Sequence, residues 1–237
     1  MTSLTEAAVL STIKTALREQ PRSLQQGIGP SELGNECEHC LAAKLAGWVQ
    51  HPQAAWLPAI GTFVHTALAE IFERHPDRYL VETRVMVGRL GDKEVWGSSD
   101  LYDKETDTVV DYKIVGATTL KAAAKTGPTR RYFTQAHAYG TGFANAGYPV
   151  KRVAICYLPR NALSLDFGVW WEAHYDPSIT TLALNHAEAI LWQIEGLRAV
   201  DPAAVPVWIG GLPRAKGCFD CARYADAPHD LADLVGV

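Results

Sequence analysis

The segment Val109-Val110-Asp111-Tyr112-Lys113-Ile114, near the middle of this 237-residue chain, is the most informative part of the sequence for predicting the fold. The β-branched and apolar residues of the segment predict a buried strand. In an extended strand, alternate side chains point to the same face. Asp111 and Lys113 therefore share one face of the predicted strand, while the hydrophobic side chains between and beside them point to the other. Charged groups on such a strand mark either a solvated face or a site.

A second acid favours a site. Asp100 precedes Asp111 by 11 residues and lies on another strand-like run. Carboxylate oxygens are the ligands that Mg²⁺ and Mn²⁺ prefer, and a lysine beside them suits the attack of water on a phosphodiester. The spacing therefore predicts metal-assisted phosphodiester hydrolysis. It is a weak signal by itself, because surface hairpins also produce it.

The elements on either side of this segment define the fold class. Hydrophobic periodicity predicts a helix over 58–74, a three-strand meander over 79–90, 94–103 and 108–114, and a helix over 131–146. Strands over 150–158 and 168–175 follow, then a long helix with Ser178 as its N-cap and its end near Val200, and then a largely irregular tail. This order predicts an α/β protein with a mixed central β-sheet flanked by helices.

The composition sets the broad class. Apolar residues make up 48% and charged residues 20% of the chain, as in an ordinary globular protein. We expect one domain over 1–237, with a core at about 56–200 and flanking parts at 1–55 and 201–237. No apolar run approaches the roughly 20 residues of a membrane span, and 1–20 has the pattern of an amphipathic helix rather than a signal peptide. These features predict a cytoplasmic protein that does not associate with a membrane.

The charge is unevenly distributed along the chain. The net charge is −4, yet no acid occurs between Tyr112 and Leu165. That stretch contains eight cations, namely Lys113, Lys121, Lys125, Arg130, Arg131, Lys151, Arg152 and Arg160. A basic zone directly after a metal site predicts a nucleic-acid track. The alternative is a basic surface that faces an acidic one within the fold.

Further candidates surround the two acids. His65 falls at the edge of the apolar stripe of its helix, where an ordinary boundary residue is common, and Gly61 on the same side permits close approach of a neighbouring backbone. Glu82 lies on the first strand and either supports the site from behind or faces the metal. Arg131, Gln135 and Tyr139 recur at every fourth position. They form either a solvated flank with Tyr139 half buried or an edge for phosphate and base contacts.

Taken together, these residues resemble a known family. Over 61–139, the set Gly61-x3-His65, Glu82, Gly97-x2-Asp100, Asp111-Tyr112-Lys113 and Gln135-x3-Tyr139 is similar in order and spacing to the RecB-type branch of the PD-(D/E)XK nucleases. The resemblance implies a DNA nuclease that uses Mg²⁺ or Mn²⁺, most simply an exonuclease acting on single-stranded DNA or on DNA ends.

The resemblance also implies a role for each site residue. His65, Asp100, Asp111 and the Tyr112 carbonyl would hold the catalytic metal, Lys113 would orient or help deprotonate the attacking water, and Gln135 would contact the nucleic-acid backbone. Two other functions remain open: a structure-specific endonuclease of the same fold, and a zinc-stapled, non-catalytic nucleic-acid-binding or adaptor protein.

Four of the five cysteines form two C-x2-C pairs, Cys37/Cys40 and Cys218/Cys221, separated by 178 residues at their nearest ends. In a cytoplasmic protein such pairs favour metal ligation over disulfides, and four thiolates suit either Zn²⁺ or an iron–sulfur cluster. The fifth, Cys156, falls in a strand and is expected to pack as a small hydrophobic residue.

A subset of the RecB-type nucleases informs the choice of metal. The iron–sulfur CRISPR-adaptation nucleases and related helicase–nuclease subunits join their chain ends through one N-terminal and three C-terminal cysteines, and residues 29–33 of this chain are similar to their lead-in. This resemblance favours a structural 4Fe–4S cluster, with Zn²⁺ as the alternative, and it implies a recombination, helicase or CRISPR-adaptation partner. Here the cysteines divide two and two, and Ala227 stands where a third C-terminal cysteine is expected.

Overall fold

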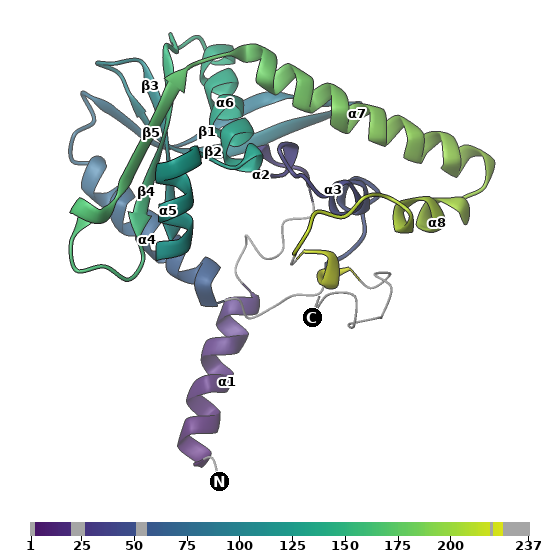
Figure 1. The fold of residues 1–237 in the computed structure, drawn as a ribbon, viewed down its shortest axis with the longest axis horizontal. Helices are drawn as coiled ribbons and strands as arrows, with labels where there is room; N and C mark the ends of the chain where they lie inside the picture. The colour runs from purple at the N-terminus through teal and green to yellow at the C-terminus, as the bar shows by residue number, and fades with distance from the viewer. Residues whose placement is uncertain (1–2, 20–26, 51–55, 219, 225–237) are drawn as a thin grey trace.

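The computed structural model describes residues 3–19, 27–50, 56–218 and 220–224, so Ala227 lies outside the described residues. Its centre is a five-stranded sheet in the order β1-β2-β3-β4-β5 (Figure 1). β1 (Tyr79–Leu90), β2 (Lys93–Asp103) and β3 (Thr108–Val115) form an antiparallel meander. β4 (Arg152–Pro159) runs parallel to β3, and β5 (Val169–His174) runs antiparallel to β4. The expected α/β fold with a mixed sheet is confirmed.

Helices cover both faces of the sheet. On one face, α5 (Ala117–Thr126), α6 (Arg130–Asn145) and α7 (Pro177–Val200) pack over the main hydrophobic core. On the other face, α4 (Trp56–Phe72) covers a smaller cluster that includes Val110 and Tyr112. Alternate residues of β3 therefore face different layers, and the parallel step from β3 to β4 is made through α5 and α6.

A third hydrophobic cluster lies beside the sheet and joins distant parts of the chain. It packs α3 (Glu38–Leu45) against α7 and against α8 (Ala204–Gly210), and it contains Cys37, Cys40 and Cys221. The short helix α2 (Pro30–Leu33) precedes α3 and contacts α6. Two 3₁₀ turns, η2 (Leu165–Phe167) and η3 (Cys221–Arg223), lie in the β4–β5 connection and near the C-terminal end of the described chain.

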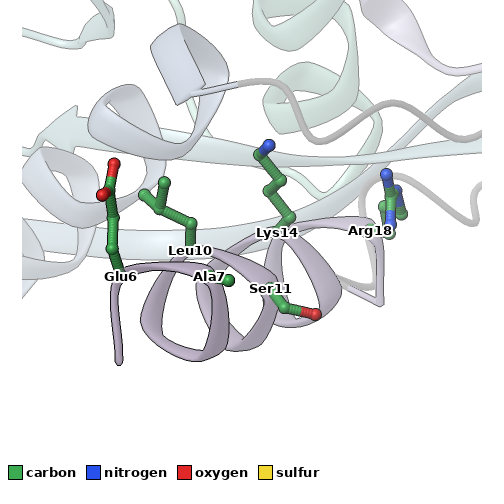
Figure 2. Close-up of a pocket in the computed structure, with 6 residues that line it drawn as sticks. All are labelled: Glu6, Ala7, Leu10, Ser11, Lys14 and Arg18. Atoms are coloured by element: carbon green, nitrogen blue, oxygen red, sulfur yellow. The ribbon is translucent and has the colours of Figure 1, made fainter. Parts of the chain in front are cut away.

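The N-terminal helix α1 (Leu4–Arg18) projects from the rest of the protein (Figure 1). Ser3 caps it by accepting a hydrogen bond from the Glu6 amide at 3.0 Å. Figure 2 shows Glu6, Leu10 and Lys14 pointing to one side of α1, as their spacing of four residues requires. Among the described residues, no helix combines the length and the hydrophobicity needed to cross a membrane.

Several local expectations from the sequence are wrong. Residues 117–126, for which the sequence pattern predicted no helix, form α5, and the tail, expected to be largely irregular, contains α8. Both helices bury only two side chains, so their apolar stripes are too narrow to stand out in the sequence. The N-cap of α7 is Asp176 rather than Ser178. The Asp176 carboxylate accepts a hydrogen bond from the Ser178 amide, and Pro177 occupies the first helical position.

The apolar stripe of α4 is only partly buried. Phe63 and Ile71, which belong to the expected stripe, are 54% and 50% exposed. The side chains of Leu68 and Phe72 pack against the sheet instead. Gly61 does not provide a close approach, because a Cβ atom placed there would meet no other atom of the described residues within 4 Å.

Candidate functional site

The candidate active site lies where β2 and β3 separate. The two strands pair only at Leu101–Val110, Tyr102–Val109 and Asp103–Thr108. Beyond this point β3 continues beside β4 alone, and the Tyr112 amide donates to Asp100 Oδ2 at 2.6 Å in place of a strand partner. The carboxylate of Asp100 thus satisfies a backbone group that the separation leaves unpaired.

Three metal-ligating side chains meet at this separation. His65 Nδ1 of α4 lies 3.1 Å from Asp100 Oδ1 of β2. The ligand atoms of His65, Asp100 and Glu82 of β1 all lie within 4.8 Å of one another. An imidazole and two carboxylates form a donor set that suits Mn²⁺ or Mg²⁺. The residues present therefore fit the divalent metal that the sequence predicts.

Glu82 reaches the site through an unusual backbone conformation. Strand pairing passes from Val81–Leu101 to Thr83–Ser99, and Glu82 and Asp100 lie opposite each other between these two pairs. Glu82 has a φ of 43°, a conformation that is rare in residues other than glycine and costs about 1–3 kcal/mol. Strain of this kind tends to persist at functional sites, and here it accompanies a carboxylate next to Asp100 and His65.

Lys113 is held from several directions. As the strand pattern predicts, it lies on the same face as Asp111, and its Nζ is 2.6 Å from Asp111 Oδ2. The same nitrogen donates to Gln135 Oε1 of α6 at 3.0 Å and lies 4.8 Å from the centre of the Tyr132 ring. Gln135 Nε2 in turn donates to the Tyr139 hydroxyl at 3.4 Å. The ammonium group is therefore fixed in position beside Asp111.

Burial and neighbouring charge change the acid–base properties of the site. Asp111 is 2% exposed, and burial raises its pKa to about 6, with the nearby Asp100 adding to the rise and Lys113 opposing it. Burial lowers the pKa of His65, but the hydrogen bond to Asp100 and the charges of Asp100 and Asp111 outweigh burial, so the net shift is upward. Both effects follow from bringing acids together in a site with little solvent.

The structure places the predicted site residues in two adjoining groups. His65, Glu82 and Asp100 form the close donor set, and Asp111 forms an ion pair with Lys113. Gln135 and Tyr139 are buried, so the alternative of a solvated flank on α6 is wrong for them, and Gln135 binds Lys113. Sequence reasoning missed Tyr132, although its position three residues before Gln135 places both on one helix face.

Gly97, another element of the motif, does require a close approach. A Cβ atom there would lie 2.5 Å from Pro30 Cγ and 3.0 Å from the Tyr139 ring. The absent side chain therefore lets α2 pack on β2 beside the residue that supports Gln135.

The basic zone divides into two parts. At the start of β4, Lys151 forms an ion pair with Asp107 and Arg152 forms one with Glu172. These two cations therefore face acidic groups within the fold, which was the alternative to a nucleic-acid track. Four other cations lie towards the end of β3 and β4 where Lys113 is found. All four are exposed. Lys121 and Lys125 lie on α5, Arg130 is the first residue of α6, and Arg160 lies beside Gly116.

Arg131 belongs to neither part. Its Nε donates to the Ser31 carbonyl at 2.8 Å, and its Nη1 is 3.5 Å from Asp220 Oδ2. This side chain therefore connects the start of α6 to α2 and to the C-terminal segment.

The cysteine pairs converge as expected. Cys221 Sγ lies 3.5 Å from Cys37 Sγ and 3.4 Å from Cys40 Sγ, and Cys218 Sγ lies 3.6 Å from Cys40 Sγ. A hydrogen bond with Cys40 lowers the pKa of the Cys37 thiol to about 4, whereas burial raises the pKa of Cys221 to about 12. Four sulfurs this close together suit a bound cation. The Cys156 thiol lies apart in the cluster under α4, and burial raises its pKa.

The fold has counterparts among solved structures. The alkaline exonuclease LHK-Exo of Laribacter hongkongensis, in its complex with dAMP, is 15% identical with a TM-score of 0.53, covering 77% of this chain and 95% of that one. The crystal structure of SSO0001 is 14% identical with a TM-score of 0.51, covering 82% and 96%. At these identities the likeness concerns the fold alone. No protein-family model and no curated protein matches the sequence.

Proposed function

We propose that this protein is a metal-dependent DNA nuclease, acting as an exonuclease on single-stranded DNA or DNA ends. The observation that carries the proposal is the meeting of His65, Glu82 and Asp100 beside the Asp111–Lys113 pair. A binding protein has no need of a buried carboxylate paired with a lysine next to a strained metal-ligating acid. The fold likeness to an alkaline exonuclease supports the same chemistry.

Each residue then has a defined task. His65, Glu82, Asp100 and Asp111 would hold Mg²⁺ or Mn²⁺, which would polarise the phosphate and offset the negative charge that develops on it. Lys113 would orient the attacking water and stabilise that charge, since Asp111 and Gln135 keep its ammonium group in place. Because Gln135 is occupied in this way, we assign it to positioning Lys113 rather than to contacting DNA.

The substrate would approach along the exposed cations at the same end of the sheet. Lys121, Lys125, Arg130 and Arg160 are positioned to contact phosphates without reading sequence. A track of this kind suits a nuclease that acts on many sequences. From the resemblance to the RecB-type nucleases we further propose a recombination, helicase or CRISPR-adaptation partner.

Cleavage assays test the proposal directly. End-labelled linear and circular single-stranded DNA are incubated with Mn²⁺, with and without EDTA. Asp100→Asn removes one charge of the donor set, and Asp103→Asn is the matched control, because Asp103 lies on the same strand but pairs with Arg78 at 2.8 Å. We expect wild type and Asp103→Asn to degrade linear DNA only, and Asp100→Asn to be inactive.

The outcomes separate the alternatives. Cleavage of the circle would identify an endonuclease. Binding of DNA without any metal-dependent cleavage would leave the adaptor function, which the clustering of the four cysteines favours as a stable binding scaffold.

A further inference from the structure

We infer that Cys37, Cys40, Cys218 and Cys221 bind a single tetrahedral ion, Zn²⁺, and that the 4Fe–4S cluster implied by the resemblance does not fit them. The inference concerns the second metal centre and does not depend on nuclease activity. It rests on the separations of the sulfurs, on their pairing along the chain and on the surroundings of His39.

The sulfur separations distinguish the two groups. Three Sγ–Sγ distances are 3.5, 3.4 and 3.6 Å. Four thiolates at about 2.3 Å from one zinc ion, arranged as a tetrahedron, stand about 3.8 Å apart. In a 4Fe–4S cluster each cysteine binds a different iron atom, so the body of the cluster keeps the cysteine sulfurs well apart. Each of the four sulfurs lies within 3.6 Å of at least one other, a spacing that leaves room for one ion between them and not for a cluster.

The placement of the ligands along the chain agrees with zinc. Cys37 is the N-cap of α3 and Cys40 lies in its first turn, while Cys221 begins η3 three residues after Cys218. Two short turns, each supplying two thiolates, form the paired arrangement of zinc ribbons and related structural sites. The iron–sulfur relatives divide their ligands one and three, and this chain does not.

His39 supports the same centre from outside. Its ring is fully buried, and its ligand atom lies within 4.8 Å of the sulfurs of Cys37, Cys40 and Cys221. Its Nδ1 lies 3.9 Å from Cys40 Sγ, whereas Cys218 Sγ approaches the same sulfur to 3.6 Å. We therefore assign Cys218 as the fourth ligand and His39 as a hydrogen-bond donor to the Cys40 sulfur. Ring nitrogens in this position orient a ligand and reduce the charge on a thiolate.

The centre adjoins the helix that supports Lys113. Asp220 precedes Cys221 and forms the ion pair with Arg131 at the start of α6. Zinc bound by thiolates from both ends of the described chain would hold this contact in place. Its role is structural, because such a site has no open coordination position for a substrate.

Metal analysis of the full-length protein tests the inference. The protein is purified anaerobically without a polyhistidine tag from cells supplied with both iron and zinc. We expect one zinc per chain, no stoichiometric iron, and a colourless solution. Replacement by Co²⁺ should give the intense visible bands of a tetrahedral thiolate site. A brown protein with four iron and four sulfide per chain would overturn the inference, and so would a protein with neither metal and four titratable thiols.

Variants test the ligand set. Cys156→Ser is the matched control and should keep one zinc, because Cys156 lies in a different cluster. His39→Gln should also keep it, whereas Cys218→Ser should lose zinc or bind it at least tenfold more weakly. Zinc retained by Cys218→Ser but lost by His39→Gln would overturn the four-cysteine assignment. All these readouts are independent of DNA cleavage, so an inactive protein that contains one zinc would count against the proposed nuclease alone.

Discussion

Replacing Asp111 by asparagine should stabilise the protein at neutral pH and abolish cleavage. Asp111 is buried, and its pKa is raised from the ordinary 3.8 to about 6. A rise of this size corresponds to about 3 kcal/mol for keeping the carboxylate ionised in the folded protein. That figure already includes the attraction of Lys113, because the ion pair is present in the structure. Asparagine has nearly the same shape and cannot ionise.

The sign of the pH dependence follows from linkage. Below pH 3.8 the acid is protonated in both the folded and the unfolded chain and has no effect. As the pH rises to about 6, the unfolded chain releases its proton first, so the metal-free wild type loses stability over this range. Asp111→Asn does not lose stability in this way, because asparagine cannot ionise. The free-energy gap between the two proteins should open from about pH 4 to pH 6 and stay near 3 kcal/mol above it.

Denaturant unfolding in EDTA from pH 4 to pH 8 measures this gap. Addition of Mn²⁺ should then stabilise the wild type more than Asp111→Asn, because the variant lacks one proposed ligand. Asp107→Asn is a control of opposite sign. The Lys151 ion pair lowers the pKa of Asp107, so this variant should be less stable than wild type at neutral pH.

Two results would contradict the role proposed for Asp111. One is an Asp111→Asn protein that is less stable than wild type at pH 7.5 in EDTA. The other is a variant that cleaves DNA at the wild-type rate with Mn²⁺, which would remove Asp111 from the catalytic centre.

Three further predictions follow from the same site. Lys113→Ala should lose about 3–4 kcal/mol of transition-state stabilisation, a rate loss of two to three orders of magnitude, while calorimetry shows Mn²⁺ affinity little changed. His65→Ala should weaken Mn²⁺ binding measurably, since it removes one of three close donors; unchanged affinity would exclude it as a ligand. Neutralising the exposed cations Lys121, Lys125 and Arg130 together should reduce the slope of log affinity for single-stranded DNA against log salt concentration by about 2. Neutralising Lys151 and Arg152, which form ion pairs at the start of β4, should leave this slope unchanged.

Local sequence pattern determined a large part of this protein. The alternation within Val109–Ile114 is a property of any extended chain, so it placed Asp111 and Lys113 on one face without knowledge of the neighbouring strands. The order of strands and helices along the chain predicted the mixed sheet flanked by helices. The two C-x2-C pairs predicted one metal centre, because the two thiolates of each pair fit a single turn and four thiolates together can bind one cation.

The way in which these pieces meet depends on contacts between segments that are distant in the sequence. The separation of β2 from β3 and the positive φ of Glu82 depend on strand pairing between distant segments, which no local period encodes. The same holds for Gln135, whose polar side chain suggested a surface contact and instead lies buried against Lys113. The acid-free stretch shows the limit most clearly, since Lys151 and Arg152 find their acids on other segments. A sequence fixes which groups are present, but charges and buried hydrogen bonds act through space, so their partners are set by the fold.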